Sequence, residues 1–160
     1  MKQLLVPVLA FALLGGICAA AAPPMAVAQE KTPANAFAFI RDNVADGSWM
    51  GNYVACRGND DCWDAEGRII GADFQNGSYC NLRFVIQTET GSATRHIDLT
   101  KAFSIWFDGY TRKIHFAGPV RNGEGEVLSG WDMHASYDIS ERVLAALHHL
   151  QTVCKPAGPW

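Results

Sequence analysis

The sequence has few charged residues and no cluster of positive charge. Lys, Arg, Asp and Glu make up 18% of the chain, and apart from the adjacent Arg112 and Lys113 the cations are scattered singly. All 16 acids lie after residue 28, where they outnumber twelve Lys and Arg and give this part a net charge of about −4. Proteins that bind nucleic acid need clustered Lys and Arg to neutralise phosphates. The sequence therefore excludes nucleic acid as an expected partner.

The sequence also lacks the short motifs of several enzyme classes. It contains no G-x-S-x-G for a serine hydrolase, no P-loop and no dinucleotide-binding glycine pattern. Every cysteine after residue 28 has a plausible disulfide partner, so a free catalytic thiol is not expected. We therefore expect no cofactor and favour a protein that is not an enzyme.

A long apolar run occurs only at the N-terminus. Residues 4–22 are apolar and lead to the small-x-small sequence ending at Ala28, which is the pattern that signal peptidase cleaves. We expect residues 1–28 to be a cleavable bacterial signal peptide and the protein to be periplasmic or secreted, with no membrane association after cleavage. A transmembrane anchor is disfavoured because the run is rich in Ala and Gly and has no basic stop after it. A lipoprotein is disfavoured because Cys18 follows Ile17 rather than a small residue.

Four cysteines remain after the signal peptide, an even number that suits disulfides in an oxidising compartment. Three pairings are possible, and we favour Cys56–Cys62 with Cys80–Cys154. The first pair encloses a short polar segment, and the second joins a predicted strand to the last helix. Chain-entropy arithmetic gives ~2.4 kcal/mol for the short loop and ~4.5 kcal/mol for the long one.

Helical periodicity is confined to the two ends of residues 29–160, which we expect to form a single disulfide-stabilised domain. The first helix has Thr32 as a suitable N-cap, a proline at its first position, and Gly47 as a left-handed cap at its end. The second helix is expected to be capped by Asp138 or Ser140. The apolar faces are formed by Phe37, Ile40 and Val44 in the first helix and by Val143, Leu144, Leu147 and Leu150 in the second.

Between the helices the apolar residues alternate with a period of two, which is typical of half-buried antiparallel strands. The expected strands are 48–56, 67–74, 79–87, 95–99, 103–107, 112–118 and 130–139. Strands that follow one another as local hairpins cannot form a parallel doubly wound sheet. The sequence therefore predicts an α+β fold, with a curved antiparallel sheet or small partly open barrel of about six or seven strands packed by the C-terminal helix.

The segment CWDAEGRIIGAD, residues 62–73, has the spacing of an EF-hand calcium loop when Gly67 is placed at its sixth position. The ligands at positions three, five and twelve would then be Asp64, Glu66 and Asp73. The first ligand would be Cys62, and a half-cystine cannot replace a carboxylate there. We expect no metal site. We expect instead an acidic turn closed by the Cys56–Cys62 disulfide, with Gly67 and Arg68 in an ordinary hairpin turn. An exposed acidic surface formed by Asp60, Asp61, Asp64 and Glu66 could still bind a cation loosely or meet a basic partner.

Three histidines and two aspartates occupy outward positions of predicted strands. They are His96, His115, His134, Asp98 and Asp132. If the strands are neighbours, these side chains could form a catalytic surface for acid–base work or metal ligation. If they are not, the histidines are separate residues on a solvated sheet face.

Five tryptophans are many for a chain of this length. Core packing accounts for some of them, but Trp106 falls at an outward position of its strand, close to Tyr110. We expect Trp106, Tyr110 and Trp131 to mark a binding face for a protein or glycan.

These observations favour an exported, non-enzymatic binding protein of the cell envelope, such as an inhibitor, an immunity-type protein or an accessory subunit. One alternative is a small secreted hydrolase that uses the His/Asp surface. Another is a purely structural component of the envelope.

Overall fold

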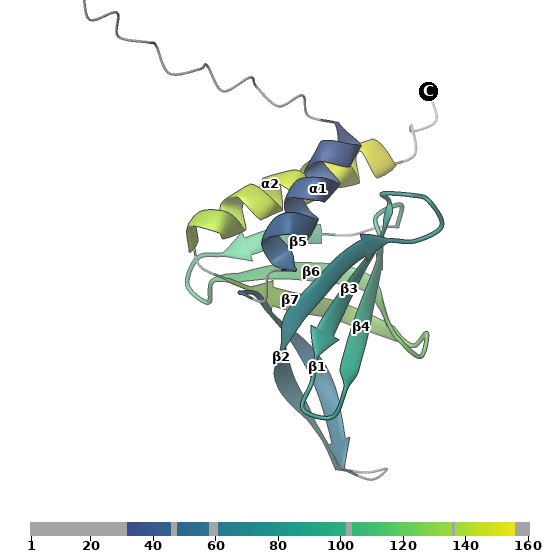
Figure 1. Ribbon diagram of the computed structural model, residues 1–160, viewed down its shortest axis with the longest axis vertical. Helices are drawn as coiled ribbons and strands as arrows, with labels where there is room; N and C mark the ends of the chain where they lie inside the picture. Colours follow the sequence, from purple (N-terminus) through teal and green to yellow (C-terminus); the bar gives the residue numbers. More distant parts are fainter. Residues whose placement is uncertain (1–31, 46–47, 58–60, 102–103, 136, 156–160) are drawn as a thin grey trace, which may run out of the picture.

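Two helices and seven strands follow one another in the predicted order, with one helix at each end of the domain (Figure 1). The computed structural model describes residues 32–45, 48–57, 61–101, 104–135 and 137–155. The helices are α1 (Pro33–Val44) and α2 (Tyr137–Cys154). The strands are β1 (Met50–Arg57), β2 (Asp61–Phe74), β3 (Asn81–Gln87), β4 (Ser92–Asp98), β5 (Ser104–Asp108), β6 (Lys113–Asn122) and β7 (Val127–His134).

All seven strands pair antiparallel in one sheet with the order β4-β3-β2-β1-β7-β6-β5. An additional pairing between β4 and β6 joins the sheet to itself, so six strands close into a small barrel and β5 extends beyond it. The α+β class, the strand number and the antiparallel barrel predicted from the sequence are therefore confirmed.

Strand β6 closes the barrel because it changes partner halfway along its length. Its first half pairs with β5 from Ala117 back to Lys113, and its second half pairs with β4 from Val120 to Asn122. The register against β7 shifts between these halves, where Gly118 has a φ of 149° that favours glycine. Pro119 follows, and proline in a sheet is confined to such irregular positions because it has no N–H to donate.

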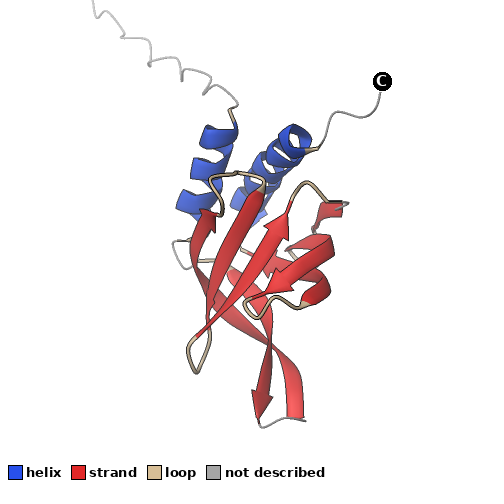
Figure 2. Ribbon diagram, turned by 90° about the vertical axis from the view of Figure 1, so that its right-hand side faces the viewer, coloured by secondary structure: helices blue, strands red, loops and turns tan. Residues whose placement is uncertain are grey.

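The barrel is incompletely sealed between β1 and β7. These strands pair only through Met50↔His134 and Gly51↔Met133. Beyond Gly51 the β1–β2 hairpin continues alone and projects past the other strands, at the end of the molecule opposite the helices (Figures 1 and 2). The partly open barrel therefore has one end beside the helices and one end beside this hairpin.

The core lies inside the barrel and under the two helices. Phe84, Phe116 and Trp131 pack together within the barrel, with ring centroids of Phe84 and Phe116 at 5.1 and 5.3 Å from that of Trp131. Helix α1 begins after Thr32, whose hydroxyl accepts the Asn35 N–H at 3.2 Å, and it buries the predicted face. Helix α2 packs on α1 and on the edge formed by β5 and β6.

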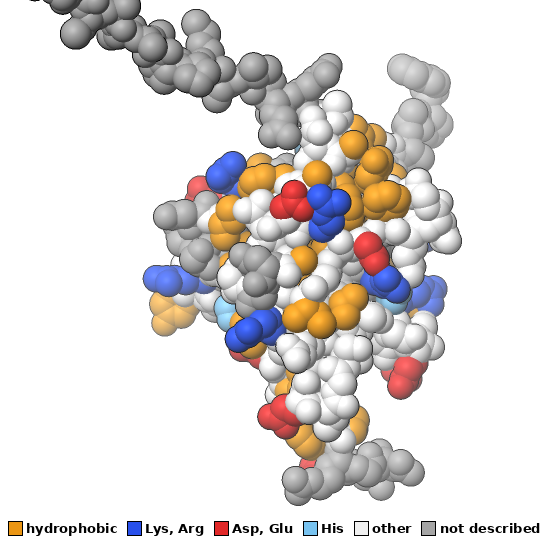
Figure 3. Space-filling view, in the orientation of Figure 1, with side chains coloured by type: hydrophobic (Ala, Val, Ile, Leu, Met, Phe, Trp, Pro, Cys, Tyr) orange, Lys and Arg blue, Asp and Glu red, His pale blue; other side chains and the backbone are white. Residues whose placement is uncertain are grey.

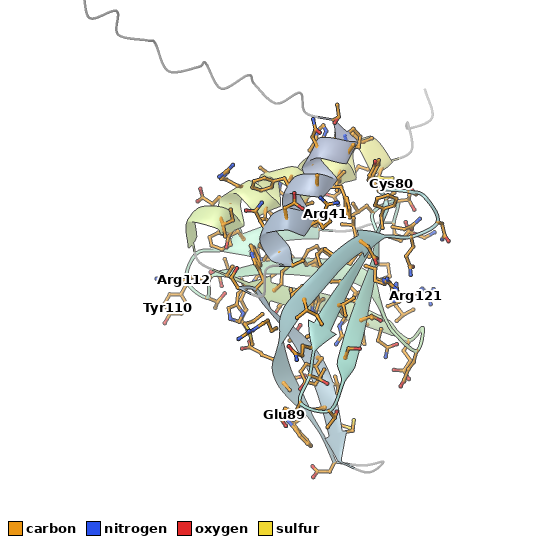
Figure 4. All side chains as sticks on the ribbon, viewed as in Figure 1. Arg41, Cys80, Glu89, Tyr110, Arg112 and Arg121 are labelled. Carbon is orange, nitrogen blue, oxygen red and sulfur yellow. A yellow bond between two sulfur atoms is a disulfide. The ribbon has the colours of Figure 1, made fainter. Side chains whose placement is uncertain are left out.

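Both disulfides have the pairing expected from the sequence. Cys56 lies directly opposite Cys62 across the β1–β2 hairpin, and the two are bonded. Cys80 precedes β3 and is bonded to Cys154, the last residue of α2 (Figure 4). The second disulfide therefore ties the sheet to the C-terminal helix.

Two local predictions are wrong. Gly67 does not lie in a turn, because β2 runs straight through it; a Cβ there would lie 2.3 Å from the Gln87 carbonyl oxygen. The strand predicted through Ile139 stops at His134, and α2 begins at Tyr137, so Asp138 and Ser140 lie inside the helix rather than before it. The helical spacing of buried Ser140, Val143 and Leu147 outweighs the alternation of the preceding residues.

Two further expectations fall on residues that the structure does not describe. Gly47 and Asp60 both lie outside the described ranges. Helix α1 ends at Val44, and the N–H of its cap residue Ala45 is bonded to the Arg41 carbonyl oxygen.

Charged side chains of both signs are dispersed over the face shown in Figure 3, some of them as adjacent pairs of opposite sign, while hydrophobic side chains gather beside the helices. This agrees with the absence of a basic cluster in the sequence.

Gly67→Ala is expected to destabilise the fold by about 1–3 kcal/mol, because the added methyl group must displace the β3 backbone. Gly71→Ala is the matched control in the same strand, since its Cβ would meet only Val85 at 3.5 Å. Urea unfolding measures both. Equal loss of stability in the two variants would show that close backbone approach is not the reason for Gly67.

Replacing Cys80 and Cys154 together by Ser is expected to lower the free energy of unfolding more than replacing Cys56 and Cys62 together. Removing the Cys80–Cys154 disulfide, which closes the long loop, is expected to cost ~4.5 kcal/mol of chain-entropy stabilisation. Removing the Cys56–Cys62 disulfide, which closes the short loop, is expected to cost ~2.4 kcal/mol. Thermal and denaturant unfolding of the two double variants provide the comparison. A larger loss in the hairpin variant would contradict this order.

Candidate functional site

Trp106, His115 and Asp132 meet on the outer face of three neighbouring strands. His115 on β6 lies directly between Trp106 on β5 and Asp132 on β7 in the strand register. The His115 Nδ1 atom lies 2.7 Å from Asp132 Oδ1. The indole of Trp106 stacks on the His115 ring with centroids 5.0 Å apart and planes 20° apart. Three of the residues singled out in the sequence are thus brought into contact.

Asn52 on β1 extends this row. Its side-chain oxygen accepts the Asp132 backbone N–H at 3.1 Å, across the region where β1 and β7 no longer pair with each other. A shallow depression of about 230 Å³ is lined by Asn52, Trp106, His115, Asp132 and neighbouring residues. The His115 and Asp132 side chains remain 21% and 32% exposed, so a ligand can reach them.

His134 lies on the same outer face but has a different partner. Lys113 and His134 are cross-strand neighbours, and both approach Glu66 of β2. Lys113 Nζ donates to Glu66 Oε1 at 3.3 Å, and His134 Nδ1 lies 3.8 Å from the same oxygen. These residues form an ion-pair cluster beside the His115–Asp132 pair.

His96 and Asp98 lie elsewhere, on β4. His96 is opposite Arg83 in β3 and Arg121 in β6, and its ring nitrogens lie 3.1 Å from Gln75 Oε1 and Thr94 Oγ1. Asp98 accepts the Thr100 backbone N–H at 3.0 Å in the turn after β4. The structure therefore does not bring all three predicted histidines together.

The surroundings of His96 oppose its protonation. Burial is the main cause that lowers the pKa of His96 below 6.5, and the positive charge of Arg83 lowers it further. Asp73 acts in the opposite direction, and it also accepts a 2.8 Å hydrogen bond from Arg83 Nε.

The three predicted binding aromatics differ in their accessibility. Trp106 is 45% exposed and Tyr110 is 96% exposed, whereas Trp131 is 2% exposed. The Trp131 indole N–H donates to the Asn52 carbonyl oxygen at 3.1 Å, so this side chain packs in the core beneath the site. Of these three aromatics, only Trp106 and Tyr110 are open to a partner.

The turn between β5 and β6 is ordered by Asp108. Its carboxylate accepts the Thr111 hydroxyl at 2.8 Å and the Tyr110 backbone N–H at 2.9 Å. The Thr111 bond is the main cause of the lowered pKa of Asp108, and the Tyr110 N–H adds to it. Tyr110 and Arg112 both project from this turn, away from the barrel (Figure 4).

The arrangement can serve binding, and it can serve acid–base work through the His115–Asp132 pair. An imidazole can act as a general base when a carboxylate holds it in the required orientation. Such a pair is one part of a hydrolytic site. Across the described ranges, no group of three or more His, Cys, Asp and Glu side chains could hold a metal ion.

Two residues that matter here were not singled out from the sequence. Asn52 gave no signal, because its role depends on the gap between β1 and β7. Arg95 gave one: the alternation that places Ile97 and Leu99 inward places Arg95 inward too, and it is only 5% exposed.

Replacing Arg83 by Gln is expected to raise the pKa of His96, because the repelling charge disappears while Asp73 remains. Asp73→Asn is the opposite control and should lower it further. Titration of the His96 ring by NMR measures both. Because the unfolded chain binds this proton more tightly, the contribution of His96 to stability should decline as the pH falls through 6.5. A pKa unchanged in both variants would contradict this electrostatic assignment.

Comparisons of the chain with protein-family models, with curated proteins and with solved structures found no match. Within the part of the chain that the structure describes, neither helix is sufficiently long and apolar to cross a membrane.

Proposed function

We propose that this is an exported, non-enzymatic binding protein of the cell envelope that contacts a partner protein through the outer face of β5, β6 and β7. The proposal rests on Trp106, whose exposed indole is held in a fixed orientation by stacking on His115. Tryptophan, tyrosine and arginine are the side chains most often responsible for the affinity of protein interfaces.

The orientation of Trp106 is fixed by a chain of contacts across four strands. Trp106 stacks on His115, His115 contacts Asp132, and the backbone of Asp132 donates to Asn52. A side chain that is already ordered loses less conformational entropy when a partner binds. This arrangement therefore favours recognition by a preformed surface.

The neighbouring β5–β6 turn enlarges the surface. Tyr110 and Arg112 project from it, and Asp108 holds its backbone in place. Arg112 has a φ of 59°, a conformation that non-glycine residues seldom adopt. A tight, ordered turn that presents Tyr and Arg to solvent favours contact with a protein surface.

Export is supported by two features of the chain. The first is the apolar N-terminal sequence ending in a small-x-small pattern, which is typical of a signal peptide. The second is the pair of disulfides, because such bonds persist in oxidising compartments such as the periplasm. An inhibitor, an immunity-type protein or an accessory subunit would combine these features with a binding face.

A small secreted hydrolase is the second candidate, favoured by the 2.7 Å contact between His115 and Asp132. In that case the shallow depression beside Trp106 would receive the substrate, and His115 would act as the base. His96 offers a matched control, because it lies on another part of the barrel.

Trp106→Ala is expected to weaken partner binding by about 30-fold or more, the loss typical of a central interface residue. The partner would be captured from envelope extract with the wild-type protein, and its affinity for each variant then measured by calorimetry. Trp63→Ala is the matched control, since Trp63 is 46% exposed against 45% for Trp106. Unchanged affinity in Trp106→Ala and Tyr110→Ala would contradict the proposed face.

Hydrolysis is tested in parallel with chromogenic ester, amide and glycoside substrates. The binding proposal predicts no turnover that depends on His115. Activity that is lost in His115→Ala and Asp132→Asn but kept in His96→Ala would favour the hydrolase instead.

A further inference from the structure

Arg95 is a buried cation inside the barrel that forms no ion pair with the residues that the structure describes. It lies on the inward face of β4 and is 5% exposed. Its Nη1 and Nη2 atoms donate to backbone carbonyl oxygens, of Thr94 at 2.9 Å and of Asn52 at 3.2 Å. Its Nε atom is buried and has no hydrogen-bond partner in the described part of the chain.

This arrangement costs folding free energy. A buried charge is expensive unless a partner of opposite sign and a full set of hydrogen bonds compensate it. Burial lowers the pKa of Arg95 from its ordinary value, which reflects the same cost. A long apolar side chain would fill this position more favourably, so fold stability does not explain an arginine here.

A cleft lies directly beside Arg95, at the end of the barrel opposite the helices. It has a volume of about 710 Å³ and lies between the β1–β2 hairpin, the start of β4 and the turn from β6 to β7. Small-molecule sites typically have volumes of about 300–1,000 Å³. Arg95, Tyr53, Val54 and Leu128 line this cleft and also a smaller cavity of about 190 Å³ between β1 and β7.

The walls of the cleft restrict the chemistry of its ligand. Tyr53, Val54, Ala93 and Leu128 line the cleft together with Arg95 and provide apolar surface. Glu124 and Glu126 lie on the side formed by the β6–β7 turn, where an acidic rim would repel a ligand carrying several negative charges. The cleft is therefore suited to one anionic group next to an apolar body.

We propose that the mouth of the barrel binds small monocarboxylates with an apolar body, and that Arg95 pairs with the carboxylate. Arginine binds carboxylates through charge-assisted hydrogen bonds, and two of its five N–H groups are already used by backbone carbonyls. Asp64, Glu124 and Glu126 line the cavities beside Arg95 but form no ion pair with it. The ligand supplies this ion pair, and its apolar part covers the wall opposite the acidic rim. This site is separate from the Trp106 face and does not depend on it.

The test uses 4-phenylbutyrate as the probe and the full chain as the protein. We expect saturable binding by calorimetry and a rise in the unfolding temperature. The neutral 4-phenylbutyramide should bind at least about tenfold more weakly, since it lacks the charge. Inorganic phosphate is a third probe, and it should not compete. Phosphate binding as tight as that of phenylbutyrate would overturn the assignment to monocarboxylates.

The variant Arg95→Met distinguishes the contribution of Arg95 to ligand binding from its contribution to fold stability. It should keep or raise the unfolding temperature, because it removes an uncompensated buried charge, and it should weaken phenylbutyrate binding at least about tenfold. Arg68→Met, on an exposed position of β2, is the matched control and should bind as the wild type does. Full binding in Arg95→Met, or no saturable binding by the wild type up to about 10 mM, would overturn the proposal.

Binding to the wild-type protein can also be located directly, in case Arg95→Met does not fold. NMR titration with phenylbutyrate should shift the Arg95 Nε–H and the amides of Val54, Ala93 and Leu128. Shifts confined to Trp106 and His115 would overturn the proposal and place the ligand on the outer face instead.

Discussion

The pairing of β4 with β6 is the constraint on which the rest of the structure depends, because it turns an open sheet into a barrel. It forms only because β6 leaves β5 at Gly118 and Pro119 and continues alongside β4. The first half of β6 then carries His115 between Trp106 and Asp132 on the outside. Closure also places Arg95 of β4 inside, beside the end of the barrel that the helices do not cover.

One feature of the closed barrel connects its two candidate sites, namely the short contact between β1 and β7. Because these strands separate after Gly51, the Asn52 side chain can accept the Asp132 N–H on the outer face. The Asn52 carbonyl oxygen accepts bonds from Arg95 and from the Trp131 indole N–H. A single residue thus accepts hydrogen bonds from the Asp132 backbone on the outer face and from the Arg95 guanidinium inside, although the two surfaces are proposed to bind different ligands.

The sequence predicted the features that local patterns determine. Alternation identified the strands and the inward positions of Leu82, Phe84 and Ile86, and cysteine spacing indicated both disulfides. Features that depend on strands distant in sequence could not be predicted. The contact of His115 with Asp132 requires the β6–β7 register, and the need for glycine at Gly67 arises from the β3 backbone. The alternation of β4 also placed Arg95 at an inward position. That position became informative only with the structure, in which the buried Arg95 Nε atom has no hydrogen-bond partner among the described residues.

The central claim is that the outer face of β5, β6 and β7 is the surface that a partner protein covers. Amide hydrogen exchange, measured on the protein alone and with the captured partner, tests it most directly because it locates the contact without any substitution. We expect slower exchange in 104–117 and 131–134, with 61–66 unchanged. Slower exchange confined to the β1–β2 hairpin, with β5 and β6 unaffected, would contradict it.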